Sequence, residues 1–269
     1  MARIEVPRDL DAVLDAAWAA ARKVPGYLVE DEARLLGTIA ACVPAIGAIV
    51  EIGSFKGKST VMLAKVAAHY GLGSIVAIDP HNSPELLDHK ADPAASSYKD
   101  FLRNIETAGV TDQVEPHRAY SKDVATVWNQ PIRFLWIDGD HTYESAKTDF
   151  DGFISHVSPY GVVALHDALN VFSGPIRVFV EDMLRSSRFG AAGFCHSIAW
   201  SQFRPEDGER FHAQRAALER VAAPLIPFVE DDEELHGLTK IRFKLKRSRV
   251  PRKAISPLKW ASFLDDNGS

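Results

Sequence analysis

The chain has 269 residues, of which 46% are apolar and 25% are charged, and its formal net charge is −5. Such a chain is typical of a soluble globular protein and buries roughly 70–75% of its unfolded surface. The acidic balance argues against a dedicated nucleic-acid binder, which would carry a basic face. Cys42 and Cys195 are the only cysteines and form no CxxC pair, which indicates a reducing compartment.

The first residues and the apolar runs bear on location. Charged residues stand where a secretory signal would need an apolar core, and no apolar run is long enough to span a membrane. We therefore expect a cytoplasmic protein with neither a membrane partner nor a nucleic-acid partner.

Helical spacing of apolar residues predicts helices over residues 9–22 and 30–42, separated by Pro25 and Gly26. From residue 48 onward, short apolar strands alternate with amphipathic helices. The predicted strands cover residues 48–52, 74–78, 113–118, 132–137 and 161–165. The predicted helices cover 59–70, a face from Tyr98 to Ile105, a face from Ala146 to Val157, and 176–184.

Mostly apolar strands that alternate with helices indicate a parallel sheet covered on both faces. Asp79, Asp138 and Asp167 each follow the carboxyl end of a predicted strand. In an open α/β sheet, ligands bind at that edge. We therefore predict a doubly wound, Rossmann-like, mostly parallel seven-stranded sheet with its site along this edge.

The last third of the chain has a different pattern. Residues 193–202 and 238–246 are predicted to be two further strands that pair antiparallel at the sheet edge. A polar helical insertion with an acidic patch at 230–234 lies between them, and the basic stretch 244–253 is interpreted as a solvated tail. We expect one domain over 1–269, composed of N-terminal helices (1–44), a cofactor-binding core (45–185), and edge strands, insertion and tail (186–269).

Residues 51–60, EIGSFKGKST, form a glycine-rich turn after the first predicted strand. A phosphate-binding P-loop places four residues between its first glycine and the Gly-Lys-Ser/Thr triplet. Gly53 and Gly57 are separated by only three residues, so the ring of N–H groups around a phosphate would not close in the same way. Glu51 would also bring negative charge to a polyanion. A cationic or zwitterionic cofactor suits this turn better, and a P-loop-like nucleotide phosphotransferase is the alternative hypothesis.

The neighbouring residues narrow the choice of cofactor. The N–H groups of residues 57–60 and the Ser59 hydroxyl suit an amino-acid carboxylate. Asp79 has the spacing of an acid that binds ribose hydroxyls, and the G-x-G-x-x-G pattern of dinucleotide sites is absent. S-adenosylmethionine (SAM) has a ribose, an amino-acid end and no pyrophosphate, so we predict it as the cofactor. Further candidates for its cleft are Ser54, Pro80 and His81. In the alternative interpretation, Gly53 and Gly57 only shape a tight turn.

A second polar group follows the fourth and fifth predicted strands, and consists of Asp138, Asp140, His141, His166 and Asp167. Because these strands should be neighbours, Asp138 and Asp167 are expected to reach one divalent ion. Carboxylates suit Mg²⁺, and His166 would make the site tolerant of a softer metal. The catalytic candidates are Asp138 and His141, with His141 as the general base for a substrate hydroxyl. In the alternative interpretation, Asp140 is the N-cap of the next helix and His166 is a packed strand-end residue.

These motifs, in this order over residues 45–185, resemble class I SAM-dependent methyltransferases. The likeness is strongest to O-methyltransferases of the catechol and caffeoyl-CoA type and to their bacterial relatives acting on sugars and natural products. The pattern Glu-x-Gly-x-x-x-Gly-x-Ser of that family matches Glu51, Gly53, Gly57 and Ser59, and its ribose acid matches Asp79. The resemblance also implies that Ser121, in the sequence Ser-Lys-Asp, lies at the adenine and that Asp138 binds a metal.

The sequence departs from that family at two places. His141 stands where the catechol enzymes carry a catalytic lysine, and the pair His166 and Asp167 stands where they have Asp-Asn as metal ligands. The resemblance implies O-methylation of a hydroxylated small molecule, such as a sugar, natural product or phenol, by a homodimer. The segments outside the match are expected to shape the acceptor pocket or a dimer contact. A non-catalytic cofactor-binding module on the same fold is a third hypothesis, because a fold does not establish activity.

Overall fold

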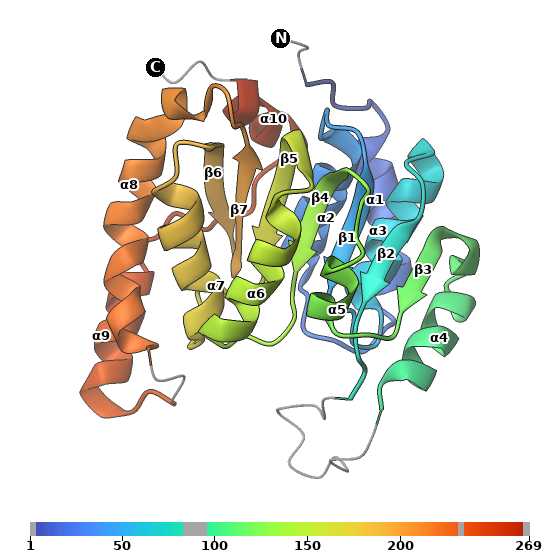
Figure 1. The fold of residues 1–269 in the computed structure, drawn as a ribbon, viewed down its shortest axis with the longest axis horizontal. Helices are drawn as coiled ribbons and strands as arrows, with labels where there is room; N and C mark the ends of the chain where they lie inside the picture. The colour runs from blue at the N-terminus through green and yellow to red at the C-terminus, as the bar shows by residue number, and fades with distance from the viewer. Residues whose placement is uncertain (1–3, 83–95, 231–233, 266–269) are drawn as a thin grey trace.

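The computed structural model describes residues 4–82, 96–230 and 234–265 (Figure 1). Its centre is a seven-stranded sheet in the order β3-β2-β1-β4-β5-β7-β6. The strands are β1 Ala48–Ile52, β2 Ile75–Ile78, β3 Val114–His117, β4 Ile132–Ile137, β5 Val157–Leu165, β6 Phe189–Cys195 and β7 Ile198–Phe203. β1 to β5 run parallel, and β7 pairs antiparallel with both β5 and β6. The predicted fold class is confirmed.

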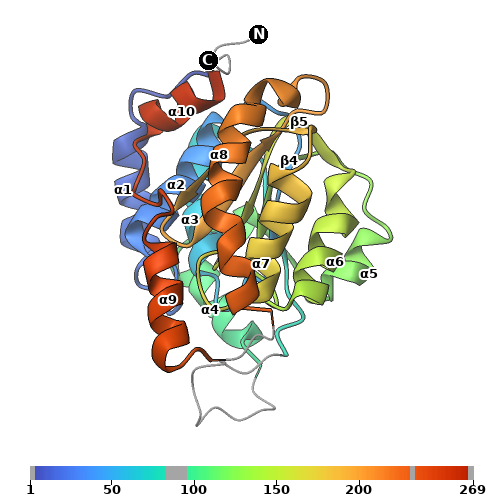
Figure 2. The same cartoon turned by 90° about the vertical axis from the view of Figure 1, so that its left-hand side faces the viewer.

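Helices cover both faces of the sheet. The α-helices are α1 Leu10–Ala21, α2 Glu30–Cys42, α3 Lys58–Tyr70, α4 Tyr98–Thr107, α5 Ser121–Ala125, α6 Tyr143–Ile154, α7 Ser173–Val178, α8 His212–Ala222, α9 Gly237–Arg247 and α10 Pro257–Asp265. Short 3₁₀ segments are η1 Thr111–Gln113, η3 Gly208–Phe211 and η4 Ala223–Phe228, and η2 Phe179–Leu184 is a π-helical continuation of α7. Figure 2 shows α1 and α2 on one side of the sheet and α6 on the other.

The central strands are buried on both faces because alternate side chains enter two different cores. In β4, Phe134 and Trp136 belong to the core beneath α1, α2 and α3. Leu135 and Ile137, on the other face, belong to the core beneath α6 and α7. This two-sided burial explains why the strands are nearly continuous apolar runs.

Backbone hydrogen bonds bring the carboxyl ends of the central strands together. Gly53 N donates to Ile78 O at 2.9 Å, and Asp138 N donates to Ile52 O at 2.8 Å. His166 N donates to Ile137 O at 3.0 Å. The residues that directly follow β1, β4 and β5 therefore lie side by side, as the sheet argument predicts.

The C-terminal third corrects one predicted element. The predicted strand 238–246 is wrong, since this segment forms helix α9. The antiparallel hairpin lies wholly within 189–203, where a two-residue turn at His196 and Ser197 separates β6 from β7. β6 and β7 supply the antiparallel hairpin, and residues 238–246 instead pack against the body of the protein through the buried Phe243. The segment before α9 is helical as expected, and most of the predicted acidic patch lies outside the described residues.

Among the residues that the structure describes, no helix has the length and the apolar character needed to cross a lipid bilayer.

Candidate functional site

The glycine-rich turn between β1 and α3 packs directly against the end of β4. Gly53 has a φ of 85°, and a Cβ atom there would lie 2.1 Å from the carbonyl oxygen of Asp138. Gly57 has a φ of 89° and immediately precedes α3. A side chain would be strained at both positions. The glycines therefore have structural roles, and they bring the turn that starts α3 against Asp138.

The Glu51 carboxyl group is fully buried at the base of this turn. Its Oε2 accepts a hydrogen bond from the Thr60 hydroxyl at 2.5 Å, while Oε1 has no hydrogen-bond partner among the described residues. Burial raises the pKa of Glu51 to about 8, an effect to which the Asp138 and Asp79 carboxylates add. The Ser59 and Thr60 hydroxyls oppose this rise only in part. A cation placed against Oε1 would favour the ionised form.

Two serines of the turn are also buried. Ser54 is 2% exposed, and its Oγ has no partner within the described part of the chain. Ser59, in the first turn of α3, is buried with its hydroxyl at the Glu51 carboxyl group. Buried polar atoms without partners are rare in folded proteins. Glu51 Oε1 and Ser54 Oγ therefore mark this turn as a place for a ligand.

Asp79 follows β2, and its carboxylate faces the same turn. Its Oδ2 accepts a hydrogen bond from Phe55 N at 2.7 Å, and its Oδ1 accepts one from His81 N at 2.6 Å. A carboxylate has about four acceptor positions, so both oxygens can accept further donors. The side chain is 15% exposed, which leaves it accessible. This arrangement suits the binding of ribose hydroxyls.

His81 and Ser121, both predicted to bind the cofactor, make side-chain hydrogen-bond contacts with other residues of the protein. The His81 ring is buried with Nδ1 2.8 Å from the Ser97 hydroxyl, and burial lowers its pKa. Ser121, the first residue of α5, donates a hydrogen bond to buried Asp149 of α6. Pro80 is half-buried between Asp79 and His81.

Sequence reasoning missed Asp149. Burial raises the pKa of this carboxyl group to about 6. Its burial could have been inferred from the sequence, because Asp149 lies between Ala146 and Phe150 on the apolar face of a predicted helix.

The polar residues after β4 and β5 meet as predicted. His166 Nδ1 lies 3.0 Å from Asp138 Oδ1 and 3.6 Å from Asp167 Oδ1. His141 Nε2 lies 3.3 Å from Asp167 Oδ2 and 3.7 Å from Asp138 Oδ1. The contacts of His141 are ion-pair contacts rather than aligned hydrogen bonds. Two acids and two histidines thus form one cluster, the strand-end cluster, at the carboxyl edge of the sheet.

A third acid reaches the strand-end cluster from outside the motif region. Glu32 of α2 is 3% exposed, and its Oε2 lies 3.4 Å from His166 Nε2. Its Oε1 accepts hydrogen bonds from the backbone N–H and the hydroxyl of Ser197 at 3.0 and 2.6 Å. Glu32 therefore connects the N-terminal helices and the β6–β7 turn to the cluster. Sequence reasoning missed it because an acid in the first turn of a helix is ordinarily explained by the helix dipole.

The charges of the cluster stabilise one another. Burial alone would lower the pKa of His166 and His141, but the surrounding carboxylates outweigh burial and raise both. Burial alone would raise the pKa of Glu32 and Asp167, but contacts with the histidines and other donors outweigh it and lower both. The cluster as it stands favours imidazolium and carboxylate forms.

The donor atoms of the cluster fit a divalent ion. Asp138, His141 and His166 each offer one ligand atom, and these atoms lie within 4.8 Å of one another. The predicted ligand set had Asp167 in place of His141. Glu32 contacts Nε2 of His166, while Nδ1 of His166 faces Asp138. A metal-binding histidine commonly contacts a carboxylate through one ring nitrogen and the metal through the other, and His166 could do the same.

The alternative interpretation of Asp140 as a helix N-cap is wrong. Thr142 is the N-cap of α6, and its hydroxyl accepts a hydrogen bond from Ser145 N at 3.4 Å. Asp140 Oδ1 instead accepts one from Thr142 N at 3.0 Å, and so shapes the loop that carries His141. The His141 ring rests against Phe172, with 4.6 Å between ring centroids.

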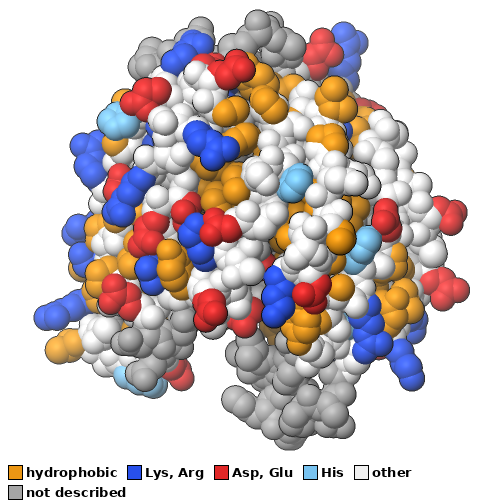
Figure 3. Space-filling view, in the orientation of Figure 1, with side chains coloured by type: hydrophobic (Ala, Val, Ile, Leu, Met, Phe, Trp, Pro, Cys, Tyr) orange, Lys and Arg blue, Asp and Glu red, His pale blue; other side chains and the backbone are white. Residues whose placement is uncertain are grey.

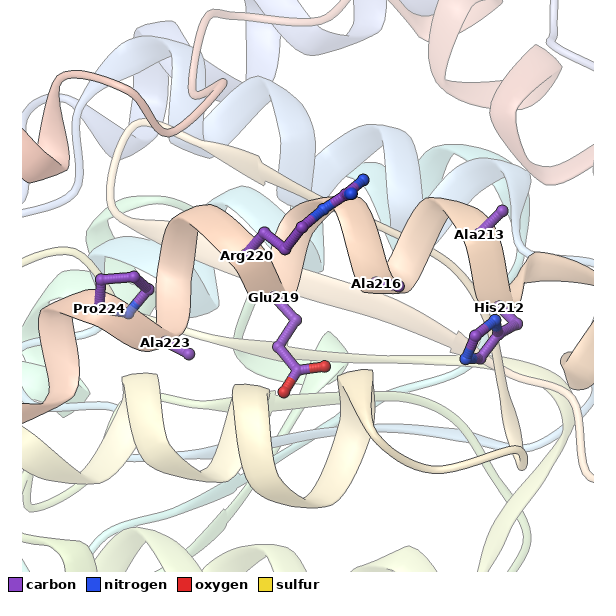
Figure 4. A pocket seen from close by; sticks show the side chains of 7 residues that line it. All are labelled: His212, Ala213, Ala216, Glu219, Arg220, Ala223 and Pro224. Atoms are coloured by element: carbon purple, nitrogen blue, oxygen red, sulfur yellow. The ribbon is translucent and has the colours of Figure 1, made fainter.

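A surface hollow of about 550 Å³ lies along α8 and the start of η4 (Figure 4). Its lining includes Ala216, Glu219 and His212. Glu219 already accepts a hydrogen bond from Arg185 at 2.7 Å, and none of the acids and histidines of the strand ends faces this hollow. We therefore place the functional site at the strand ends.

Residues 50–168 match a family model described as a methyltransferase domain. This span begins in β1 and ends after β5, so it contains the glycine-rich turn, Asp79 and the strand-end cluster. The match covers less than half of the chain, and over this span the chain is similar to a methyltransferase domain.

Solved structures of other proteins share the fold of this chain. The O-methyltransferase NovP is 14% identical with a TM-score of 0.57, over 72% of this chain and 98% of NovP. The cofactor-bound protein Rv0187 from MTB is 20% identical with a TM-score of 0.53, over 75% and 92% of the two chains. The O-methyltransferase TomG from Streptomyces achromogenes, solved in complex with SAM, is 16% identical with a TM-score of 0.50, over 75% and 92%.

Segments outside the family match complete the candidate site. Glu32 comes from α2, and Ser197 comes from the β6–β7 turn. Lys58 Nζ, in the glycine-rich turn, donates to Gly26 O at 2.9 Å, which joins the turn to the segment between α1 and α2. The N-terminal helices are thus connected to both halves of the site.

Proposed function

We propose that the protein transfers the methyl group of SAM to a hydroxyl group of a small molecule such as a sugar, natural product or phenol. The observation that carries this proposal is the pair of unpartnered buried atoms, Glu51 Oε1 and Ser54 Oγ, beside the strand-end cluster. They lie in the turn where a methyltransferase core would hold the amino-acid end of its cofactor. NovP and TomG, both named as O-methyltransferases, share the fold.

The residues present fit SAM. Asp79 would accept the ribose hydroxyls, Glu51 would favour the cationic ammonium group, and the N–H groups at the start of α3 would favour the carboxylate. Ser121 would border the adenine. SAM supplies a methyl group on a sulfonium, which leaves as a neutral thioether after transfer.

His141 is proposed as the general base. Its Nε2 is buried and lacks an aligned hydrogen-bond partner among the described residues. Because the neighbouring carboxylates raise the pKa of His141, the ring accepts a hydroxyl proton only in its neutral form, which is the main form above that raised pKa. Phe172 holds the ring from the side, and the Asp138 and Asp167 carboxylates stabilise the positive charge that the ring gains. The acceptor hydroxyl would bind between His141 and the glycine-rich turn.

A divalent metal is proposed for the same cluster, held by Asp138, His166 and Asp167. Mixed carboxylate and imidazole donors suit Mg²⁺ less than Mn²⁺ or another borderline metal. His141 also lies within reach of this position, and its two roles exclude each other, because a metal-bound nitrogen accepts no proton. We assign it the role of base and propose Asp167 as the third ligand, because its Oδ1 lies 3.6 Å from His166 Nδ1. Action as a homodimer in the cytoplasm stays a prediction.

The experiment is a turnover assay with SAM and a panel of sugars, phenols and other hydroxylated molecules. Formation of S-adenosylhomocysteine together with a methylated acceptor supports the proposal. Stoichiometric SAM binding that is never followed by its consumption would favour a non-catalytic module on the same fold.

A further inference from the structure

Helix α9 presents an apolar stripe that nothing in the described part of the chain covers. Leu238, Ile241 and Leu245 are 72%, 62% and 60% exposed. At about 100° per residue, positions i, i+3 and i+7 fall on one face of a helix. Phe243 lies on the opposite face and is 3% exposed. The helix therefore binds the body through Phe243 and turns three aliphatic side chains away from it.

The stripe results from the sequence pattern of this segment. Residues 241–246 alternate apolar and basic side chains, a period of two that suits a strand. In a helix, the same alternation places Phe243 on the face opposite Ile241 and Leu245, so burial of Phe243 leaves the other two exposed. A helix whose only role is to pack on the protein would place polar residues on its outer face.

Basic residues border the stripe. Arg242 and Lys244 are exposed on either side of it, about 40–60° of helical rotation from its nearest member. α9 itself contains five Lys and Arg and no Asp or Glu, although the acidic run 230–234 closely precedes it in the sequence. Figure 3 shows Lys and Arg side chains along the edge of the molecule where α8 and α9 lie in Figure 1.

α9 is held firmly beside the functional site. Arg247 donates a hydrogen bond to the carbonyl oxygen of Leu169 at 3.2 Å, two residues after the strand-end cluster. Beyond the helix, Arg252 O accepts a hydrogen bond from His196 N at 2.8 Å, in the β6–β7 turn. The stripe therefore has a fixed position relative to the edge of the sheet where the site lies.

We propose that α9 docks the protein on an anionic lipid bilayer, with Leu238, Ile241 and Leu245 in the interface and Arg242 and Lys244 against lipid phosphates. Short basic helices with an aliphatic face bind membrane surfaces in this way, without spanning them. A second copy of the chain fits less well, since it would bring the same positive charges together. A nucleic-acid backbone offers no apolar partner for the stripe. This surface binding is distinct from a membrane span, whose absence led us to expect no membrane partner from the sequence.

The test is co-sedimentation of the full chain with vesicles of phosphatidylcholine alone and of phosphatidylcholine with phosphatidylglycerol. The wild-type protein should bind the mixed vesicles, bind neutral vesicles much more weakly, and lose binding as salt rises. The variants L238S/I241S/L245S and R242Q/K244Q should each bind roughly tenfold more weakly or worse. The matched control is Leu258→Ser, at a 74% exposed leucine of α10, and it should bind like the wild type.

All of these side chains are exposed, so the melting temperatures should match the wild type. If the wild-type protein fails to bind anionic vesicles, the proposal is wrong. An acidic protein surface would then be the partner to test for the stripe. Binding that the triple serine variant retains in full also overturns the proposal, because general charge attraction would then explain the result. The test does not depend on the proposed methyl transfer, since vesicle binding is measured without SAM.

Discussion

Glu32 and His166 meet in a buried contact of 3.4 Å between Oε2 and Nε2, which joins the first turn of α2 to the residue after β5. The same carboxylate accepts two hydrogen bonds from Ser197. One side chain thus holds together three segments that are far apart in the sequence. Two of these segments lie outside the matched domain.

Replacing Glu32 should destabilise the protein. Glu32→Ala leaves His166 and Ser197 with buried donors and no acceptor, so the free energy of unfolding should fall by about 3–5 kcal/mol. Glu32→Gln keeps an acceptor for Ser197 and should cost less. Urea unfolding measures both, with Glu30→Ala, an exposed acid of the same helical turn, as the matched control. Equal stability of the Ala variant and this control would contradict the structural role of Glu32.

Glu51 should make stability depend on pH. Its folded pKa of about 8 lies above its ordinary value of 4.5, so the folded state holds the proton more tightly than the unfolded state. Its contribution to stability is full below pH 4.5 and is lost as pH rises toward about 8, by at most about 1.4 kcal/mol per pH unit. Glu51→Gln cannot ionise and should lose this part of the pH dependence. Parallel stability curves for wild type and variant across that window would show that the pKa is not raised.

Asp79 should contribute to cofactor affinity. Asp79→Asn removes the charge that favours ribose hydroxyls and weakens the hydrogen bond from Phe55 N, so the dissociation constant for SAM should rise about tenfold or more. Isothermal calorimetry measures it. Asp112→Asn, at an exposed acid before β3, serves as the control and should not change the affinity. An unchanged affinity in Asp79→Asn would remove this residue from the cofactor site.

His141 should matter for turnover rather than for cofactor binding. His141→Ala removes the proposed base, so kcat should fall by about 10²–10⁴-fold while the SAM dissociation constant stays unchanged. His212→Ala changes an exposed histidine of the hollow along α8 and should leave kcat as it is. Turnover that survives in His141→Ala would exclude it as the base, and a loss in His212→Ala would direct attention to the hollow.

Metal binding should require Asp138. Calorimetric titration with Mn²⁺ should give one site in the wild-type protein and none in Asp138→Asn, since this carboxylate contacts both His141 and His166. Asp140→Asn keeps a side chain near the cluster that contacts only the α6 loop in the described structure, and it should still bind. No Mn²⁺ binding by the wild type, or undiminished turnover in EDTA, would count against a functional metal.

Much of the core could be predicted because it follows local rules. β1 and β4 begin and end at the predicted residues, and the acids after β2, β4 and β5 lie at the predicted edge. β5 is longer than predicted and begins at Val157, the residue where the preceding helix was expected to end. Pro159, Tyr160 and Gly161 lie inside this longer strand, where Tyr160 has a φ of 67°.

What could not be predicted depends on contacts between distant segments. Glu32 looks like a surface acid until α2 is placed against β5, and His81 looks like a cleft residue until α4 covers it. The period of two in residues 241–246 predicts a strand, but the segment contains good helix formers and forms α9, which packs through Phe243. In each of these cases the local sequence pattern allowed two structures, and tertiary packing determined which one forms.

The central claim is that the glycine-rich turn binds SAM rather than a nucleotide phosphate. Isothermal calorimetry of the purified protein with SAM, S-adenosylhomocysteine and ATP tests it most directly. We predict one-to-one binding of SAM and S-adenosylhomocysteine, weakened in Asp79→Asn, and no binding of ATP. Binding of ATP without binding of either sulfur-containing ligand would contradict the account and restore the phosphotransferase hypothesis.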